Sequence, residues 1–263
     1  AEGVASGIAE YVRDGWNYND VAILYRTNAQ SRALEEKLMI HNIPYKIYGG
    51  QNFYQRKEIK DILAYLKTID NGLDGQAVKR IINVPKRGIG NTTIDRLQEY
   101  ADFNDITFWE ALVNAKDIDT IKNAALSKLE PFVDLIGRLR AKEEFMSLKE
   151  LAEAVIEDTG YIESLSQNET VEEVEARREN LDEFINKVVS YEESCKEAGE
   201  EPTLSGLLEE VALIADIDNL DESEPHVMLM TLHSAKGLEF PIVYMTGMED
   251  GLFPSYMTIV SDD

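Results

Sequence analysis

The most constraining stretch of the sequence is a pair of apolar runs separated by a polar loop. Residues 227–231 read VMLMT, residues 241–245 read PIVYM, and the loop between them reads LHSAKGLEF. Apolar runs of this length suit strands that are buried on both faces of a parallel sheet. Ligands bind such sheets at the carboxyl ends of the strands, so we expect the loop to belong to a binding site. The alternative is an ordinary surface turn with polar residues.

The rest of the sequence predicts an α/β block that is interrupted by a long helical segment. An amphipathic helix is expected over residues 1–13, strands over 21–25 and 44–48, and a helix between these strands that ends near 42. Helical spacing then dominates until about residue 214, with several Ser or Thr residues placed to cap helices. We therefore predict a mainly helical α/β fold with a parallel sheet. Residues 1–53 and 225–263 form the sheet domain, and residues 54–224 form an all-helical insertion.

Composition limits the possible functions. The 263 residues carry a formal charge of −24, which argues against a protein that coats nucleic acid by bulk attraction. No apolar run approaches the ~20 residues that span a bilayer. The single cysteine, Cys195, favours a reducing cytoplasm, and three scattered histidines do not suggest a zinc site. A nuclease is disfavoured because the sequence has no clustered Asp, Glu and Lys residues that would form a metal site.

The charges of the insertion are unevenly distributed. Residues 163–224 contain 20 acidic and 4 basic side chains, which is typical of a solvated helix surface. Residues 79–96 contain 5 basic and 1 acidic side chain and surround the run VPKRGIGNTT. Gly88 and Gly90 permit positive φ, and Asn91 or Thr92 can cap a following helix whose free amides attract an anion. A hairpin of this kind holds a DNA phosphate without reading bases, although a tight turn between helices explains the glycines equally well.

The run TLHSAKGLEF, residues 231–240, closely resembles motif V of the superfamily 1 DNA helicases of the UvrD/PcrA/Rep family. The resemblance covers nearly the whole chain. It includes VAILYRTNAQSR at 21–32, FYQRKEIKD at 53–61, the GIG element at 88–90, and GMEDGLFP at 247–254, which we read as scaffold. It implies a PcrA-like, C-terminal fragment in which the sheet domain is a partial RecA-like 2A domain and the insertion is the 2B subdomain.

The resemblance also implies roles for individual residues. It assigns contacts with single-stranded DNA to Arg26, Asn28, Thr231 and His233, and the edge of the ATP cleft to Gly237 and Glu239. It assigns contacts with duplex DNA to Arg56, Lys57, Lys60, Lys86, Arg87, Gly88, Ile89, Gly90 and Thr92. The alternatives are exposed charges on a helix for the basic residues and a structural role for the histidine.

The family resemblance implies an ATP-dependent helicase that unwinds duplex DNA in repair or replication, with ATP and Mg²⁺ as cofactors of the intact protein. The chain has no G-x-x-x-x-G-K-[ST] loop and stops before the arginine-bearing motif VI, so we expect this part alone to be inactive and to bind neither cofactor. Expected partners are single-stranded and duplex DNA, the missing N-terminal RecA-like domain, and repair, replication or transcription proteins. The expected location is the bacterial cytoplasm at the nucleoid, with no membrane contact. The alternative is a helical module that recruits proteins through its acidic surface without gripping DNA.

Overall fold

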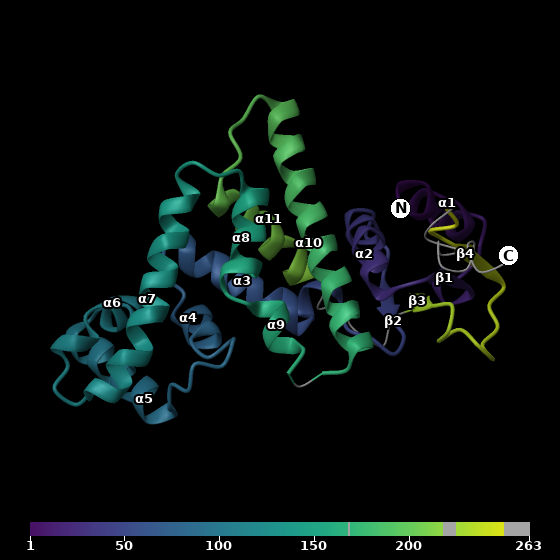
Figure 1. Ribbon diagram of the computed structural model, residues 1–263. Coiled ribbons are helices and arrows are strands. Elements are labelled where there is room, and N and C mark those ends of the chain that lie inside the picture. The colour runs from purple at the N-terminus through teal and green to yellow at the C-terminus, as the bar shows by residue number, and fades with distance from the viewer. Residues whose placement is uncertain (168, 218–224, 250–263) are drawn as a thin grey trace, which may run out of the picture. The chain divides into compact units, whose positions relative to one another are not determined.

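A computed structural model of the chain describes residues 1–167, 169–217 and 225–249 (Figure 1). Contacts within the chain define two compact units, which we call the sheet unit (Ala1–Arg56 with Ala212–Asp263) and the helical unit (Lys57–Val211). The sequence placed these limits at 53/54 and 224/225. A parallel sheet together with many helices confirms the predicted α/β, mainly helical fold class.

The sheet unit contains four strands in the order β2-β3-β1-β4, and every neighbouring pair is parallel. The strands are β1 (Val21–Tyr25), β2 (Tyr45–Ile47), β3 (Val227–Thr231) and β4 (Ile242–Met245). Strand β1 lies between the two strands that flank the polar loop, in the register Tyr25↔Thr231 and Leu24↔Met245. Because all four strands run in the same direction, their carboxyl ends share one edge of the sheet.

Two helices and three short 3-10 turns complete the described part of the sheet unit. They are α1 (Glu2–Arg13), η1 (Tyr18–Asp20), η2 (Asn28–Gln30), α2 (Ser31–Ile40) and η3 (Phe53–Gln55). One core joins Ile8 of α1 and Leu38 of α2 to Ile23 of β1 and Leu229 of β3, all of which are fully or almost fully buried. The apolar runs of the sequence therefore pack as expected for strands inside an α/β layer. The family-like segment 247–254 is described only as far as Glu249, and its remainder lies outside the described residues.

The described helical unit is built around helix α3 (Lys57–Asp70), which packs against α4, α7, α8 and α10. Its side chains Ile59, Ile62, Leu66 and Ile69 recur at helical spacing and are almost completely buried. The other helices are α4 (Gly75–Ile81), α5 (Asn91–Asn104), α6 (Phe108–Val113), η4 (Ala115–Asp117), α7 (Asn123–Glu143), α8 (Leu148–Asp158), α9 (Tyr161–Leu165), α10 (Val171–Ala198) and α11 (Leu204–Ile217), whose last residues belong to the sheet unit.

Capping boxes fix where three of these helices begin. At α8, the Ser147 hydroxyl accepts from the amide of Glu150, while the Glu150 carboxylate accepts from the amide of Ser147 at 2.9 Å. Thr107 and Thr170 make the same reciprocal pairs with the third residues of α6 and α10. Each box satisfies amides that have no partner within the helix, so the Ser and Thr signals in the sequence define real helix starts.

Candidate nucleic-acid interface

The carboxyl edge of the sheet brings together two of the segments for which the sequence predicted DNA contacts. Tyr25 and Thr231 lie opposite each other at the ends of β1 and β3. The Leu232 amide then donates to the Tyr25 carbonyl at 2.9 Å, which continues the pairing by one residue. The loop that begins at Arg26 and the loop that carries His233 therefore leave the sheet side by side. Segments 200 residues apart in the sequence meet at this edge.

Hydrogen bonds within residues 26–31 order the backbone of the loop after β1, and its polar side chains remain available for other contacts. The Gln30 side-chain oxygen accepts from the amides of Arg26 and Thr27, at 2.8 and 3.2 Å. The Ser31 hydroxyl donates to the Asn28 carbonyl at 2.9 Å. These bonds order the backbone without using the side chains of Arg26 and Asn28, which are exposed and bond to no other described residue. An exposed cation and an exposed amide on an ordered backbone suit contact with a phosphodiester backbone.

The loop after β3 turns sharply and exposes its charged side chains. The half-buried Thr231 hydroxyl accepts from the Ser234 amide at 3.2 Å and lies 2.9 Å from the Ser234 hydroxyl, so it holds the turn. Gly237 has φ +89°, which favours glycine because other residues are strained there. His233 and Glu239 are exposed at opposite ends of the loop. Of the six residues predicted for this edge, Thr231 is the one whose side chain is already committed to the fold.

The Arg56 side chain is buried within the sheet unit. Its side chain is only 8% exposed, and Nη2 donates to the Ser31 hydroxyl at 2.7 Å and lies 3.9 Å from the buried Glu35 carboxylate. The guanidinium also lies over the Phe53 ring, 5.0 Å from its centroid. The side chain is thus engaged within the protein, whereas the sequence analysis expected it to contact duplex DNA. Through Ser31, which also bonds the Asn28 carbonyl, Arg56 instead supports the loop after β1.

In the helical unit, the GIG loop between α4 and α5 is held by its own side chains. The Asn83 amide group pairs with the backbone of Ile89, donating to its carbonyl at 2.6 Å and accepting from its amide at 3.0 Å. Ile89 is buried, with 6% exposure. It therefore anchors the hairpin, with its side chain buried and both of its backbone groups bonded to Asn83.

Arg87 belongs to the same scaffold. Its Nη1 donates to the carbonyls of Ile81, Ile82 and Pro85 at 2.9–3.3 Å, and Nη2 donates to the Tyr65 hydroxyl at 2.7 Å. The guanidinium also stacks over the Phe132 ring, 4.9 Å from its centroid. The positive charge thus satisfies carbonyls at the end of α4, where the helix dipole favours a cation. A second predicted DNA contact is occupied within the protein.

The remaining part of the GIG element faces solvent. Gly88 has φ +71°, and its carbonyl accepts from Lys128 at 2.8 Å. Gly90 is the N-cap of α5 and is exposed, as are Asn91 and Thr92, whose amides have no partner within a helix of this geometry. These free amides at the positive end of a helix dipole can bind a phosphate.

Lys57 and Lys86 line a single hollow of about 340 Å³ in the helical unit. Asn83 and Pro85 of the GIG loop line it from one side, and Ser164 of α9 lines it from another. Both lysine side chains are exposed and bond to no other described residue, whereas Lys60 is half-buried. The fold therefore brings together two predicted cations from different sequence segments. Arg80 helps to fix this arrangement, because it bonds both the Asp61 carboxylate and the Lys57 carbonyl.

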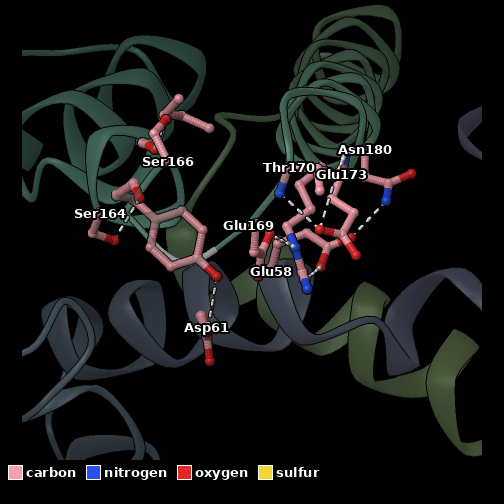
Figure 2. Close-up of polar contacts among 11 residues, drawn as sticks. Glu58, Asp61, Ser164, Ser166, Glu169, Thr170, Glu173 and Asn180 are labelled. Atoms are coloured by element: carbon pink, nitrogen blue, oxygen red, sulfur yellow. Dashed lines mark hydrogen bonds and ion pairs between the residues drawn. The ribbon is translucent and has the colours of Figure 1, made fainter.

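Two buried carboxylates tie the start of α3 to its neighbours (Figure 2). Glu58 accepts from Arg177 at 2.6 Å and from Asn180 at 2.5 Å, both on α10. Asp61 accepts from Arg80 and from the Tyr161 hydroxyl, each at 2.7 Å. Figure 2 shows both carboxylates pointing from α3 toward the helices that cover it. The first turn of α3, which carries Lys57 and Lys60, is consequently anchored.

The surroundings of this network shift two pKa values. Burial raises the pKa of the Tyr161 phenol, and the Asp61 carboxylate beside it raises that pKa further. Burial alone would lower the pKa of Arg177, but the hydrogen bond to Glu169 and the charge of Glu58 outweigh it and raise the pKa. Both groups therefore keep their protons in the neutral range.

Sequence reasoning missed the residues that support these sites. Asn83, Tyr65 and Lys128 order the GIG loop, and Glu58 and Asp61 order the start of α3. Their partners lie between 6 and 122 residues away in the sequence. One signal in the sequence could have indicated them. Glu58 and Asp61 share a helix face with apolar isoleucines, and carboxylates buried on such a face require polar partners.

Comparison with known proteins identifies the class to which this architecture belongs. The family model described as "UvrD-like helicase C-terminal domain" matches residues 1–263. The chain therefore belongs to this family, and the resemblance to the UvrD/PcrA/Rep helicases is confirmed.

Two relatives show the degree of sequence identity. The chain is 46% identical over 263 residues to the ATP-dependent DNA helicase PcrA of Staphylococcus aureus strain Mu50. It is 45% identical to the protein of the same name from Staphylococcus epidermidis strain ATCC 35984. Each match covers 100% of this chain and 35% of the relative. The chain thus spans about a third of the length of the curated relatives it matches.

No helix in the described part is both long and apolar enough to cross a membrane. Within residues 1–167, 169–217 and 225–249, no three His, Cys, Asp or Glu side chains are grouped so as to hold a metal ion.

Proposed function

We propose that this chain is the DNA-engaging part of an ATP-dependent DNA helicase. The observation that carries the proposal is the meeting of Arg26, Asn28 and His233 at the carboxyl edge of the sheet, next to the motif V loop. The match of a helicase family model to the whole chain supports it. In this proposal, DNA is bound locally by a few exposed groups, which is compatible with a formal charge of −24.

Single-stranded DNA would bind at the sheet edge. Arg26 would pair with a phosphate, while Asn28 and His233 would donate to phosphate or sugar oxygens. Gly237 and Glu239 lie at the other end of the His233 loop and would face the nucleotide. A loop of this length joins the two sites directly, so a change of nucleotide state would move the DNA contact.

Duplex DNA would bind on the helical unit. The amides that follow Gly90 and the side chains of Lys57 and Lys86 are the exposed groups that would hold phosphates, with Gly88, Thr92 and the half-buried Lys60 beside them. Arg87 and Ile89 would act indirectly by keeping the hairpin in shape. Such binding would be independent of base sequence and strongly dependent on salt.

ATP hydrolysis would require residues outside this sequence. The chain contains no G-x-x-x-x-G-K-[ST] loop, which cradles the nucleotide phosphates in helicases of this kind. We propose that the intact protein uses ATP and Mg²⁺ to unwind DNA in repair or replication, and that these 263 residues alone do not hydrolyse ATP.

Fluorescence anisotropy with a labelled duplex that carries a single-stranded tail tests the duplex part of the proposal. The chain is titrated at low and moderate salt beside a Lys57→Ala/Lys86→Ala variant. The matched control is Lys149→Ala/Lys196→Ala, which removes two exposed lysines of the same unit away from the GIG loop. Loss of two phosphate contacts should weaken binding by about tenfold and make its salt dependence shallower by roughly two counterions.

The outcomes distinguish DNA binding at the hollow from a general attraction of DNA to exposed lysines. Weak binding by the first variant and normal binding by the control would support a local grip at the hollow. Equal losses in both variants, or no salt-sensitive binding by the folded chain, would contradict it.

A further inference from the structure

Away from the GIG loop, a second hollow of about 490 Å³ lies among helices α8, α9 and α10. Two matching stripes line it, with the same helical spacing of i, i+4, i+7 and i+8. They are Lys149, Glu153, Ile156 and Glu157 on α8, and Arg178, Asp182, Ile185 and Asn186 on α10. Ile162 and Glu163 of α9 complete the lining. Side chains at this spacing share one face of a helix, so the two stripes form the walls of a groove.

The groove runs along an antiparallel helix pair. The amide of Leu148, at the start of α8, donates to the Glu192 carboxylate of α10 at 2.7 Å, which places the start of α8 beside the later part of α10. Figure 1 shows α9 following α8 along the side of α10. From Lys149 to Glu157 the α8 wall extends roughly 12 Å, about two turns of a second helix laid along it.

The floor is aliphatic, and four of the six charged side chains that line the hollow are acidic. Ile185 is 9% exposed, whereas Ile156 and Ile162 are half-buried and still present apolar surface. Of the rim carboxylates, Glu153 is paired with Lys149 at 3.5 Å. Glu157 and Glu163 are exposed and form no ion pair with a described residue. The groove therefore offers apolar contacts in the middle and uncompensated negative charge at its edge.

The carboxyl group of Asp182 is sensitive to its surroundings in the groove. Burial raises the pKa of its carboxyl group, Arg178 lowers it, and the neighbouring Glu175 raises it again. A cation placed in the groove would stabilise the carboxylate. The segment that forms α9 and α10 acts in the same direction, because residues 163–198 contain 11 acidic and 4 basic side chains. Nucleic acid is repelled by such a surface, and a basic polypeptide is attracted to it.

We propose that the groove between α8, α9 and α10 binds a basic, amphipathic helix of a partner protein, with aliphatic side chains over Ile156 and Ile162 and Lys or Arg side chains against Glu157, Glu163 and Asp182. Recognition of an amphipathic helix in a groove uses this combination of an apolar floor and a charged rim. Small-molecule sites are lined mainly by apolar and aromatic side chains, and this hollow has no aromatic lining residue. The groove is thus a surface for a protein, distinct from the proposed DNA contacts.

A pair of designed peptides tests the proposal with the whole 263-residue chain. The first is a fluorescein-labelled helix of about 15 residues, roughly four turns, with leucines along one face and lysines on the others. The second has the same composition, but its leucines are spread around the helix. The first peptide should bind with an affinity about tenfold higher than that of the second, because only the first presents a continuous apolar stripe.

Charge-neutral variants locate the site. Glu157→Gln/Glu163→Gln/Asp182→Asn removes three rim charges with almost no change in shape and should weaken binding of the first peptide by about tenfold. The matched control, Glu193→Gln/Glu197→Gln/Glu209→Gln, removes the same charge from exposed positions outside the groove and should change binding by less than about twofold. Thermal unfolding of all variants shows whether they remain folded, and backbone amide exchange shows whether the peptide protects α8 and α10.

Three results would overturn the proposal. Equal binding of the two peptides would show that no apolar groove is used. Equal losses in the rim variant and its control would show bulk attraction to an acidic surface. Amide protection around the GIG loop in place of α8 and α10 would put the peptide on the proposed DNA-binding surface instead. If the rim variant unfolds, the peptide comparison and the amide-exchange map of the unmodified chain decide the question.

Discussion

Replacing Arg87 by alanine should destabilise the helical unit by about 3 kcal/mol, although Arg87 lies in a loop next to the exposed Lys86. Arg87 donates to three carbonyls and to the Tyr65 hydroxyl. Because one Nη1 group shares its hydrogens among the carbonyls, we count two to three effective bonds at about 1 kcal/mol each. Its stacking over Phe132 adds about 0.5–1 kcal/mol. Partial exposure of the side chain keeps the total near the lower end of this sum.

Urea denaturation followed by circular dichroism measures this effect. Arg87→Lys should recover part of the lost stability, because lysine keeps the charge but cannot reproduce the planar fork of donors. Lys86→Ala is the matched neighbour. Its side chain bonds to no other described residue, so its stability should remain within about 0.5 kcal/mol of the parent chain.

Binding to the tailed duplex completes this comparison. Lys86→Ala should weaken binding without changing stability, whereas Arg87→Ala should weaken binding because the hairpin loses its support. If Arg87→Ala has the stability of the parent, or if Lys86→Ala is the more destabilised of the two, the assignment of scaffold and contact is wrong.

Further variants test the supports of the helical unit. Glu58→Ala should cost about 3–5 kcal/mol in urea denaturation because it removes the buried carboxylate that accepts from Arg177 and Asn180, and a loss below about 1 kcal/mol would contradict the role of Glu58. The pKa of Glu150 is lowered first by the backbone amide of Ser147 and then by its hydroxyl. A lowered folded pKa means that the stabilisation is present above the unfolded value of about 4.3 and is lost as the pH falls through the folded pKa. Circular dichroism from pH 6 to pH 3 should therefore show a smaller acid loss of helix in Glu150→Gln, and an identical acid profile would refute the capping effect.

The strands and the helix starts could be predicted because their signals are local. Residues 21–25 and 227–231 are strands in the sequence analysis and in the structure, because continuous apolar runs have few alternatives in an α/β protein. Ser147 and Thr107 begin helices because their hydroxyls bond amides three residues away. The meeting of β1 and β3 follows from parallel pairing, but their order in the sheet required the structure.

The roles of the basic residues could not be separated in this way. Arg56 and Lys57 are adjacent in the sequence, yet the first is buried on Ser31 and Phe53 and the second is exposed. The groups that bury Arg87 come from α3 and α7, which are distant in the sequence. A cation in a polar run has the same local pattern whether it binds a phosphate or a carbonyl, so only the tertiary partners distinguish the two.

The central claim is that the sheet edge binds single-stranded DNA and the helical unit binds the duplex. The most direct test compares two variants of an intact helicase that carries this chain, His233→Ala and Lys57→Ala/Lys86→Ala. One assay measures ATP hydrolysis in the presence of single-stranded DNA. Another measures unwinding of a tailed duplex. The account predicts that His233→Ala lowers both activities, whereas the lysine variant lowers unwinding and leaves stimulated hydrolysis unchanged. Unchanged unwinding in both variants, or equal loss of stimulated hydrolysis in both, would contradict it.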